Sequence, residues 1–253
     1  MIVLLALFAG CLFVQAFVRL RRRGRADHAS WHRVALFFGG MVIGLAALLA
    51  LDGIVDERLS GHMLQHVVLG DLVPALLVLA VRGPLLFFLL PAALLVPLSR
   101  SRTLRTLLGF LLRPEVAFTI WAVTLALWHV PALYDAVLAR PLLHELEHAM
   151  FFLGGVLVWV QLIDPARRGR LSAWARLGYA LVLFACGQAL ANVLLLSSGT
   201  LYPAYADFAD QRRAAVVMMV EQLLTLGVFA AVMLRARLRE EVVVAPDRHP
   251  FTA

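Results

Sequence analysis

The chain has 253 residues, of which 62% are hydrophobic and 15% are charged, and its mean hydropathy is +0.86. A water-soluble domain is usually about 45–50% apolar and about 25% charged, so this composition excludes an ordinary soluble protein and predicts an integral membrane protein. The formal net charge is +7, but the arginines lie in short loops between apolar runs, as the positive-inside rule describes, and they form no basic face that would favour nucleic-acid binding.

Seven apolar runs predict membrane-spanning helices, because a helix crosses the hydrocarbon with about 20 mostly apolar residues. In chain order the runs cover residues 2–18, 34–51, 59–81, 116–130, 142–163, 177–196 and 214–234. We therefore expect an all-α polytopic membrane protein in which residues 1–253 form a single domain.

One further apolar stretch, residues 84–98, is too short and too rich in proline for a span, and arginines lie on both sides of it. We expect it to be re-entrant or interfacial. The arginine-rich loops then share one side of the membrane, which predicts an outside N-terminus and an inside C-terminus. Residues 241–253 are expected to be a loose cytoplasmic tail.

Histidines are the most informative polar residues, because five of the eight are predicted at the same outer depth of the membrane. They come from three separate helices: His62 and His66, His129, and His144 and His148. Residues four apart share a helix face, so each H-x-x-x-H pair can present two ring nitrogens in one direction. Two facing pairs would form a four-imidazole metal site with His129 as a fifth ligand or a supporting residue, and imidazole suits copper, zinc, iron and nickel.

The sequence HELEH (144–148) also matches the H-E-x-x-H pattern of zinc peptidases. In that alternative Glu145 is the general base, and Asp207, Asp210 or Glu221 supplies the third ligand that a catalytic zinc needs. The pattern alone is a weak signal, and it leaves His62 and His66 without a role.

A haem-binding oxidoreductase is the other alternative that the histidines allow. Axial haem ligands are often histidines, and His62 or His66 could face His144 or His148 across a haem. Two pairs at one depth would, however, crowd a single haem.

Several other residues are expected near the histidines. Glu221 and Asn192 could orient a ligand imidazole, and Met63 and Met150 neighbour the two pairs, although plain core packing also explains these methionines. Four aromatic residues predicted at the outer interface are explained as an aromatic belt: Trp128, Tyr134, Tyr202 and Tyr205. The pair Gly154-Gly155 indicates close helix packing.

Six sequence blocks together resemble a known family. They are HMLQH (62–66) with its run to Pro74, Arg82-Gly83-Pro84, WHVPALYDAVL (128–138), PLLHELEHAMFFLGGVLVW (141–159), LYPAYADF (201–208) and DQRRAAVVMMVEQL (210–223). In this order the blocks resemble the CtaG family of cytochrome c oxidase assembly proteins, the seven-helix membrane type of bacteria with caa-type oxidases. The last block departs from the family pattern, in which a Gln-Gln pair and a glycine are expected where this chain has Gln211-Arg212-Arg213.

The resemblance implies a non-enzymatic role in the bacterial inner membrane, namely copper supply to the catalytic subunit of a haem-copper oxidase. It implies that the five outer histidines carry the copper, and that Glu147 is the glutamate of an H-x-x-E-H element. Histidine with a few methionines would hold copper less tightly than a Cys-rich site, as release requires. The implied partners are oxidase subunits and membrane lipid, and a homo-oligomer remains open.

Overall fold

The protein is almost entirely helical. The computed structural model describes residues 2–55 and 57–244, and no strand occurs among them. The helices are α1 (Ile2–Arg22), α2 (Trp31–Ala50), α3 (Asp52–Val55), α4 (Leu59–Val67), α5 (Val73–Ala80), α6 (Pro84–Phe88), α7 (Ala92–Arg100), α8 (Arg102–Leu111), α9 (Pro114–Trp128), α10 (Pro131–Leu138), α11 (Pro141–Ile163), α12 (Ala173–Leu196), α13 (Phe208–Gln222) and α14 (Val228–Val244). A short 3₁₀ turn, η1 (Ala26–His28), precedes α2, and two π-helical turns, η2 (Val68–Leu72) and η3 (Leu223–Gly227), join α4 to α5 and α13 to α14.

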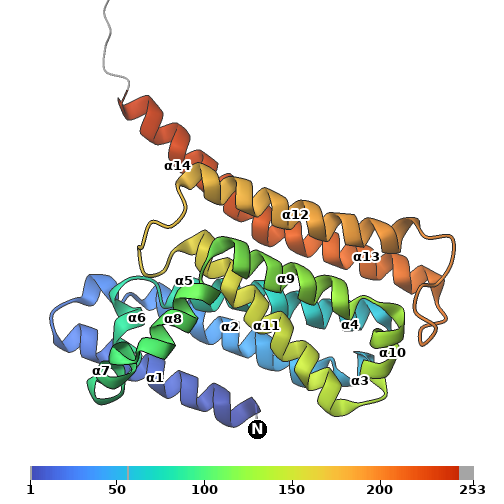
Figure 1. Ribbon diagram of the computed structural model, residues 1–253, viewed down its shortest axis with the longest axis horizontal. Coiled ribbons are helices and arrows are strands. Elements are labelled where there is room, and N and C mark those ends of the chain that lie inside the picture. The colour runs from blue at the N-terminus through green and yellow to red at the C-terminus, as the bar shows by residue number, and fades with distance from the viewer. Residues whose placement is uncertain (1, 56, 245–253) are drawn as a thin grey trace, which may run out of the picture.

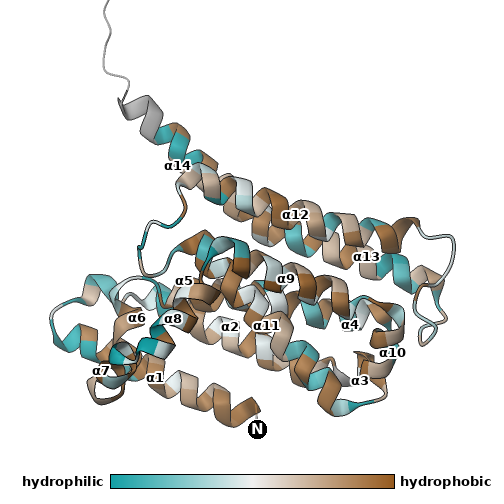
Figure 2. Cartoon of the chain, viewed as in Figure 1, coloured by the Kyte–Doolittle hydropathy of each residue, from teal (hydrophilic) through white to brown (hydrophobic). Residues whose placement is uncertain are grey.

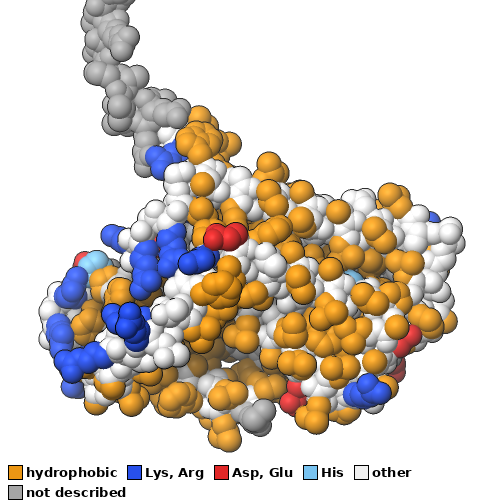
Figure 3. All heavy atoms as spheres, in the orientation of Figure 1, with side chains coloured by type: hydrophobic (Ala, Val, Ile, Leu, Met, Phe, Trp, Pro, Cys, Tyr) orange, Lys and Arg blue, Asp and Glu red, His pale blue; other side chains and the backbone are white. Residues whose placement is uncertain are grey.

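The long helices run roughly parallel to one another along one direction of the molecule (Figure 1). The α1–α2 connection and helices α6, α7 and α8 lie at one end, whereas α3, α10 and the loop between α12 and α13 lie at the other. Hydrophobic residues dominate the middle of the bundle in Figure 2, and the arginines in Figure 3 gather at the end that holds α8. We call the first the arginine-rich end. We call the second the histidine end, because α4, with His62 and His66, and the start of α11, with His144 and His148, lie there.

The expected spans correspond closely to the observed helices. Six helical segments are long and apolar enough to cross a membrane: Ile2–Arg22, Ala26–Ala50, Leu59–Ala80, Pro141–Ile163, Ala173–Leu196 and Phe208–Arg239. The third and the sixth are continuous through their π-turns. Helix α14 continues to Val244, so the expected tail begins as helix, and residues 245–253 lie outside the described part of the chain.

The remaining expected span, residues 116–130, corresponds to α9, which has 15 residues. At 1.5 Å per residue it reaches about 22 Å, less than the hydrocarbon thickness of about 30 Å. Helices α8 and α9 are apolar enough to count as one span together, but they are bent by 67°. The bundle therefore has six spans, or seven if this broken pair is counted.

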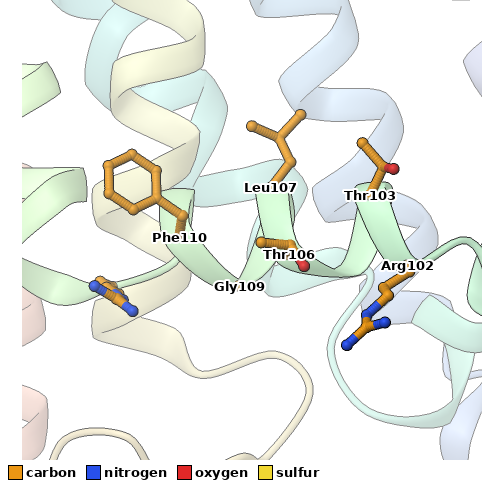
Figure 4. Close-up of a pocket in the computed structure, with 7 residues that line it drawn as sticks. Arg102, Thr103, Thr106, Leu107, Gly109 and Phe110 are labelled. Atoms are coloured by element: carbon orange, nitrogen blue, oxygen red, sulfur yellow. The ribbon is translucent and has the colours of Figure 1, made fainter.

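The stretch 84–98 forms no continuous span. It contains α6 and most of α7, with Pro91 between them and Pro97 inside α7. Helix α8 follows at the arginine-rich end, where an open hollow of about 880 Å³ borders it. Figure 4 shows Thr103, Leu107 and Phe110 on one side of α8 and Arg102 on the other. Because α8 and Arg113 alone line this hollow, it is a surface feature of one amphipathic helix and lies at the opposite end from the histidines.

Close contact between α11 and η2 fixes the positions of the two histidine-bearing helices. A Cβ atom on Gly155 would lie 1.9 Å from the carbonyl oxygen of Gly70, so only glycine allows this approach. A Cβ on Gly154 would meet Trp121 at an ordinary 3.6 Å. The expected close packing at the glycine pair is confirmed, and the close approach occurs at Gly155.

Candidate metal centre

Four imidazoles from α4 and α11 converge at the histidine end. One ring nitrogen from each of His62, His66, His144 and His148 lies within 4.8 Å of the corresponding atom of every other member. The ring centroids of each i,i+4 pair are 4.3 Å apart. Across the helix interface, the centroids of His62 and His144 are 5.0 Å apart, and those of His66 and His148 are 5.5 Å apart. The two pairs therefore face each other across α4 and α11, and we call them the four-histidine cluster.

Burial differs between the two sides of this cluster. His62 is fully buried and His66 is 3% exposed, whereas His144 and His148 are only partly buried. The cluster is thus closed on the α4 side and lies nearer the surface on the α11 side, where Nε2 of His144 and of His148 is still buried.

Tyr205, in the loop between α12 and α13, fixes the tautomer of His62. Its hydroxyl donates to the carbonyl oxygen of Val55 at 2.6 Å, and the same oxygen lies 3.1 Å from Nδ1 of His62. Because the single hydroxyl proton is directed to Val55, Nδ1 of His62 must be the donor in the second bond. The lone pair of His62 is therefore on Nε2, the atom that faces Glu147.

Glu147 supplies a negative charge between the two histidines of α4. Its side chain is fully buried, and its Oε2 atom lies 3.7 Å from Nε2 of His62 and 3.4 Å from Nε2 of His66. Glu145, the base in the zinc-peptidase alternative, is exposed instead. The glutamate that contacts the cluster is the one directly before His148.

Apart from the contacts with Glu147, the cluster contains buried polar atoms that make no hydrogen bond within the described part of the chain. Atoms without a hydrogen-bond partner include Nε2 of His62, both ring nitrogens of His66, Nε2 of His144 and His148, and both carboxylate oxygens of Glu147. Buried polar atoms are normally hydrogen-bonded. So many unpaired nitrogens and oxygens in one place therefore indicate a binding site. Nitrogens bound at about 2.0–2.1 Å around a tetrahedral ion lie about 3.4 Å apart. Modest side-chain rotation would bring the four nitrogens onto one ion, and the donor set fits a metal.

His129 is not part of this group. It follows α9, its Nδ1 donates to the carbonyl oxygen of Leu125 at 2.8 Å, and its Nε2 has no hydrogen-bond partner in the described residues. It lines a small cavity together with His66. Of the two expected roles of His129, fifth ligand or supporting residue, its position beside His66 fits the supporting role better, because its ring lines a neighbouring cavity and lies outside the group of four.

The residues that were expected to support the histidines lie at different places in the structure, and not all of them are near the cluster. Asn192 is exposed and its Nδ2 donates to Gln188 of its own helix, so it does not orient an imidazole as expected. Glu221 and Met63 line the cavity that His66 and His129 share. Met150 packs with Trp128 and Phe151 in a hydrophobic cluster, which agrees with plain core packing.

The aromatic residues near the cluster were misjudged from sequence. Trp128, Tyr134, Tyr202 and Tyr205 were explained as an interfacial belt, but all four are at most 4% exposed. The ring of Tyr134 lies 4.9 Å from that of His62, and Tyr202 donates to the carbonyl oxygen of His129 at 3.2 Å. Burial raises the pKa of Tyr202 above its ordinary value, which keeps its hydroxyl a neutral donor. These tyrosines enclose and orient the histidines, and the two tyrosines of LYPAYADF were the available signal.

Two polar contacts hold the tyrosine-bearing loop in place. Asp210 accepts hydrogen bonds from the backbone N–H and the hydroxyl of Ser60 at 3.0 and 2.6 Å, which ties the start of α13 to the start of α4. Gln211 accepts from the N–H of Leu201 at 2.7 Å and donates to Ser197 at 2.7 Å. Asp210 thus has a structural role in place of the third zinc ligand considered above.

Comparison with known proteins identifies the family. The profile of the family described as cytochrome c oxidase caa3 assembly factor (Caa3_CtaG) matches residues 11–240. The chain therefore belongs to this family, and the resemblance noted in the sequence is confirmed. Neither the curated proteins nor the solved structures gave a match.

Proposed function

We propose that this assembly factor binds copper at the four-histidine cluster and supplies it to a cytochrome c oxidase. The observation that carries the proposal is the convergence of four imidazole nitrogens within 4.8 Å, without hydrogen-bond partners in the described residues. A protein that only scaffolds an oxidase has no need of unsatisfied nitrogens in its core, because each costs stability.

Copper fits this donor set better than the alternatives. Imidazole binds copper well, while thiolates would hold Cu(I) tightly and slow its release; the chain has two cysteines, and neither belongs to the cluster. The carboxylate of Glu147 compensates part of the charge of a bound cation in a buried environment. His144 and His148 are partly exposed, so copper would leave on the α11 side once their buried Nε2 atoms are uncovered.

The zinc-peptidase alternative receives no support from the geometry. A catalytic zinc needs a base beside an open coordination position, but Glu145 is exposed and the nearby carboxylate is that of Glu147. Asp207 accepts from the N–H of Ala209, and Asp210 from Ser60, so both serve local structure.

The haem alternative also fits poorly. Two axial histidines must stand on opposite faces of a porphyrin, which has to fit between them. Here the rings of His62 and His144, and of His66 and His148, pack directly against each other across the helix interface. A macrocycle would have to separate α4 from α11, which Gly70 and Gly155 hold in close contact.

We further propose that the histidine end faces the outside of the bacterial inner membrane. The arginines gather at the opposite end (Figure 3), and the positive-inside rule assigns that end to the cytoplasm. Copper bound at the histidine end would then be available to the catalytic subunit of the oxidase on the outer side.

The test is the metal content of the oxidase made in cells whose only copy of this protein carries His144→Ala and His148→Ala. We expect an oxidase that retains haem but contains much less copper than the oxidase made with the wild-type protein. His32→Ala, which lies in α2 near the arginine-rich end, is the control and should leave copper unchanged. A fully copper-loaded oxidase in the double variant would contradict the proposal.

A further inference from the structure

A second group of polar residues lies deeper in the bundle, at the two π-helical turns. Asp71 lies in η2, and Glu221 lies two residues before the start of η3. Trp159 donates through Nε1 to Oδ1 of Asp71, and Thr225 donates to Oδ2 at 2.8 Å. Single π-helical turns occur frequently at functional sites. Two π-helical turns lie beside the facing carboxyl groups of Asp71 and Glu221, so this position is a candidate functional site.

The two carboxyl groups interact with each other and lack a cationic partner. Glu221 faces Asp71 closely enough for a hydrogen bond between the two carboxyl groups, and neither residue takes part in an ion pair with an arginine or histidine of the described chain. Two neighbouring carboxylates in a poorly polar interior need a proton or a cation to balance their charge. A proton in the hydrogen bond between the two groups meets this need, and a cation that displaces that proton would do the same.

A cavity of about 50 Å³ connects this carboxyl pair to the histidines. It is lined by Met63, His66, Asp71, His129, Met218 and Glu221, among others. A cavity needs only about 10–15 Å³ to hold one water, so an ion and a water would fit. His66 and His129 are at least nine-tenths buried and present ring nitrogens without a hydrogen-bond partner in the described residues.

We propose that this cavity is a second, inner Cu(I) site that is distinct from the four-histidine cluster. Imidazole and thioether are suitable ligands for Cu(I), and His66, His129, Met63 and Met218 provide both kinds. Asp71 and Glu221 balance the charge of the ion. The proposal rests on the proposed copper-binding function and adds a second position to it.

His66 connects the two sites. Its Nε2 lies 3.4 Å from Glu147 in the four-histidine cluster, and its ring also lines the inner cavity. Both of its nitrogens lack a hydrogen-bond partner in the described chain. A rotation of this single side chain can transfer Cu(I) between the sites without a change of oxidation state, so no electron donor or acceptor is required.

The experiment counts the Cu(I) equivalents that the detergent-purified full chain withdraws, without oxygen, from a coloured Cu(I) chelator. We expect two equivalents for the wild type and one for Met218→Leu combined with His129→Gln. Met219→Leu is the matched control, because Met219 neighbours Met218 but does not line the cavity, and it should retain two. His144→Ala with His148→Ala should lose the outer equivalent and keep the inner one.

X-ray absorption adds a readout that is independent of stoichiometry. The copper of His144→Ala with His148→Ala should show a sulfur scatterer, which disappears when Met218→Leu is added. Glu221→Gln, which keeps shape and volume, should weaken the inner equivalent at least tenfold, and each variant's fold is checked by gel filtration. One equivalent in the wild type, or two in Met218→Leu with His129→Gln, would overturn the inner site and leave the proposed function standing. If the wild type binds no Cu(I), both proposals fail.

Discussion

Oε2 of Glu147 lies 3.4 Å from Nε2 of His66 across the interface between α11 and α4, in a pocket where the two side chains are 0% and 3% exposed. A carboxylate that is buried without a hydrogen-bonded partner is costly. Glu147 retains two oxygens without a hydrogen bond in the described residues, so its position makes physical sense if a cation joins the neighbouring imidazoles.

Glu147→Gln should weaken copper binding by about tenfold to a hundredfold, the usual effect of changing a residue that supports metal ligands. The substitution keeps the shape of the side chain and removes the charge that balances the ion. Glu145→Gln is the matched control, because Glu145 lies two residues before Glu147 in the same helix and is exposed. The copper affinity of this variant should be unchanged. Chelator competition with the purified protein measures both. If Glu145→Gln had the larger effect, the peptidase arrangement would have to be reconsidered.

Tyr205→Phe should reduce copper affinity by about tenfold to a hundredfold, because the hydroxyl that fixes the His62 tautomer is lost. It should also lower the free energy of unfolding by about 1–3 kcal/mol, since the carbonyl of Val55 loses its donor. Tyr202→Phe removes only the bond to the carbonyl of His129, so the four-histidine cluster should keep its affinity. Equal losses of affinity in the two variants would show that neither tyrosine acts through a particular histidine.

Gly155→Ala should destabilise the protein by about 1–3 kcal/mol or more, because the new methyl group would lie 1.9 Å from the carbonyl oxygen of Gly70. The same displacement separates α4 from α11 and should reduce copper binding as well. Gly154→Ala adds a methyl group at 3.6 Å from Trp121 and should change neither quantity appreciably. Thermal unfolding in detergent, with copper content measured on the same samples, makes the comparison.

Asp210→Ala should loosen the loop between α12 and α13, because Ser60 then loses both of its hydrogen bonds to α13. Bonds to a charged group contribute about 1.5–3 kcal/mol, so we expect a loss of stability of that order and faster proteolysis between α12 and α13. Copper should still bind, since Asp210 does not belong to the four-histidine cluster. Loss of copper from a variant that remains folded would instead make Asp210 a ligand.

Hydropathy and spacing were sufficient to predict the helices and the facing of His62 and His66 towards His144 and His148. Apolar runs determine spans because backbone groups in lipid must be satisfied within the helix, and an i,i+4 pair determines a common face. The length of the α9 span was harder to predict, because hydropathy does not report the direction of the chain. The 67° bend falls at Leu112–Arg113, directly before Pro114, and a residue before proline disfavours the helical conformation.

The contacts around the site could not be predicted in the same way. Helix α12 is apolar over most of its surface, so nothing in its pattern sets its rotation, and Asn192 was assigned to the wrong face. Tyr202 and Tyr205 lie in a loop whose return over the histidines depends on Asp210 and Gln211. His129 occurs at the expected end of the bundle, but its side chain direction depends on the short turn between α9 and α10.

The most direct test of the central claim is metal analysis of the detergent-purified protein, wild type against His62→Ala combined with His148→Ala. The double variant removes one imidazole from each helix and should lose the copper held between α4 and α11, whereas the wild type should retain it through gel filtration. Copper retained equally by both proteins would contradict the account, because the ion could not then be held between these two helices.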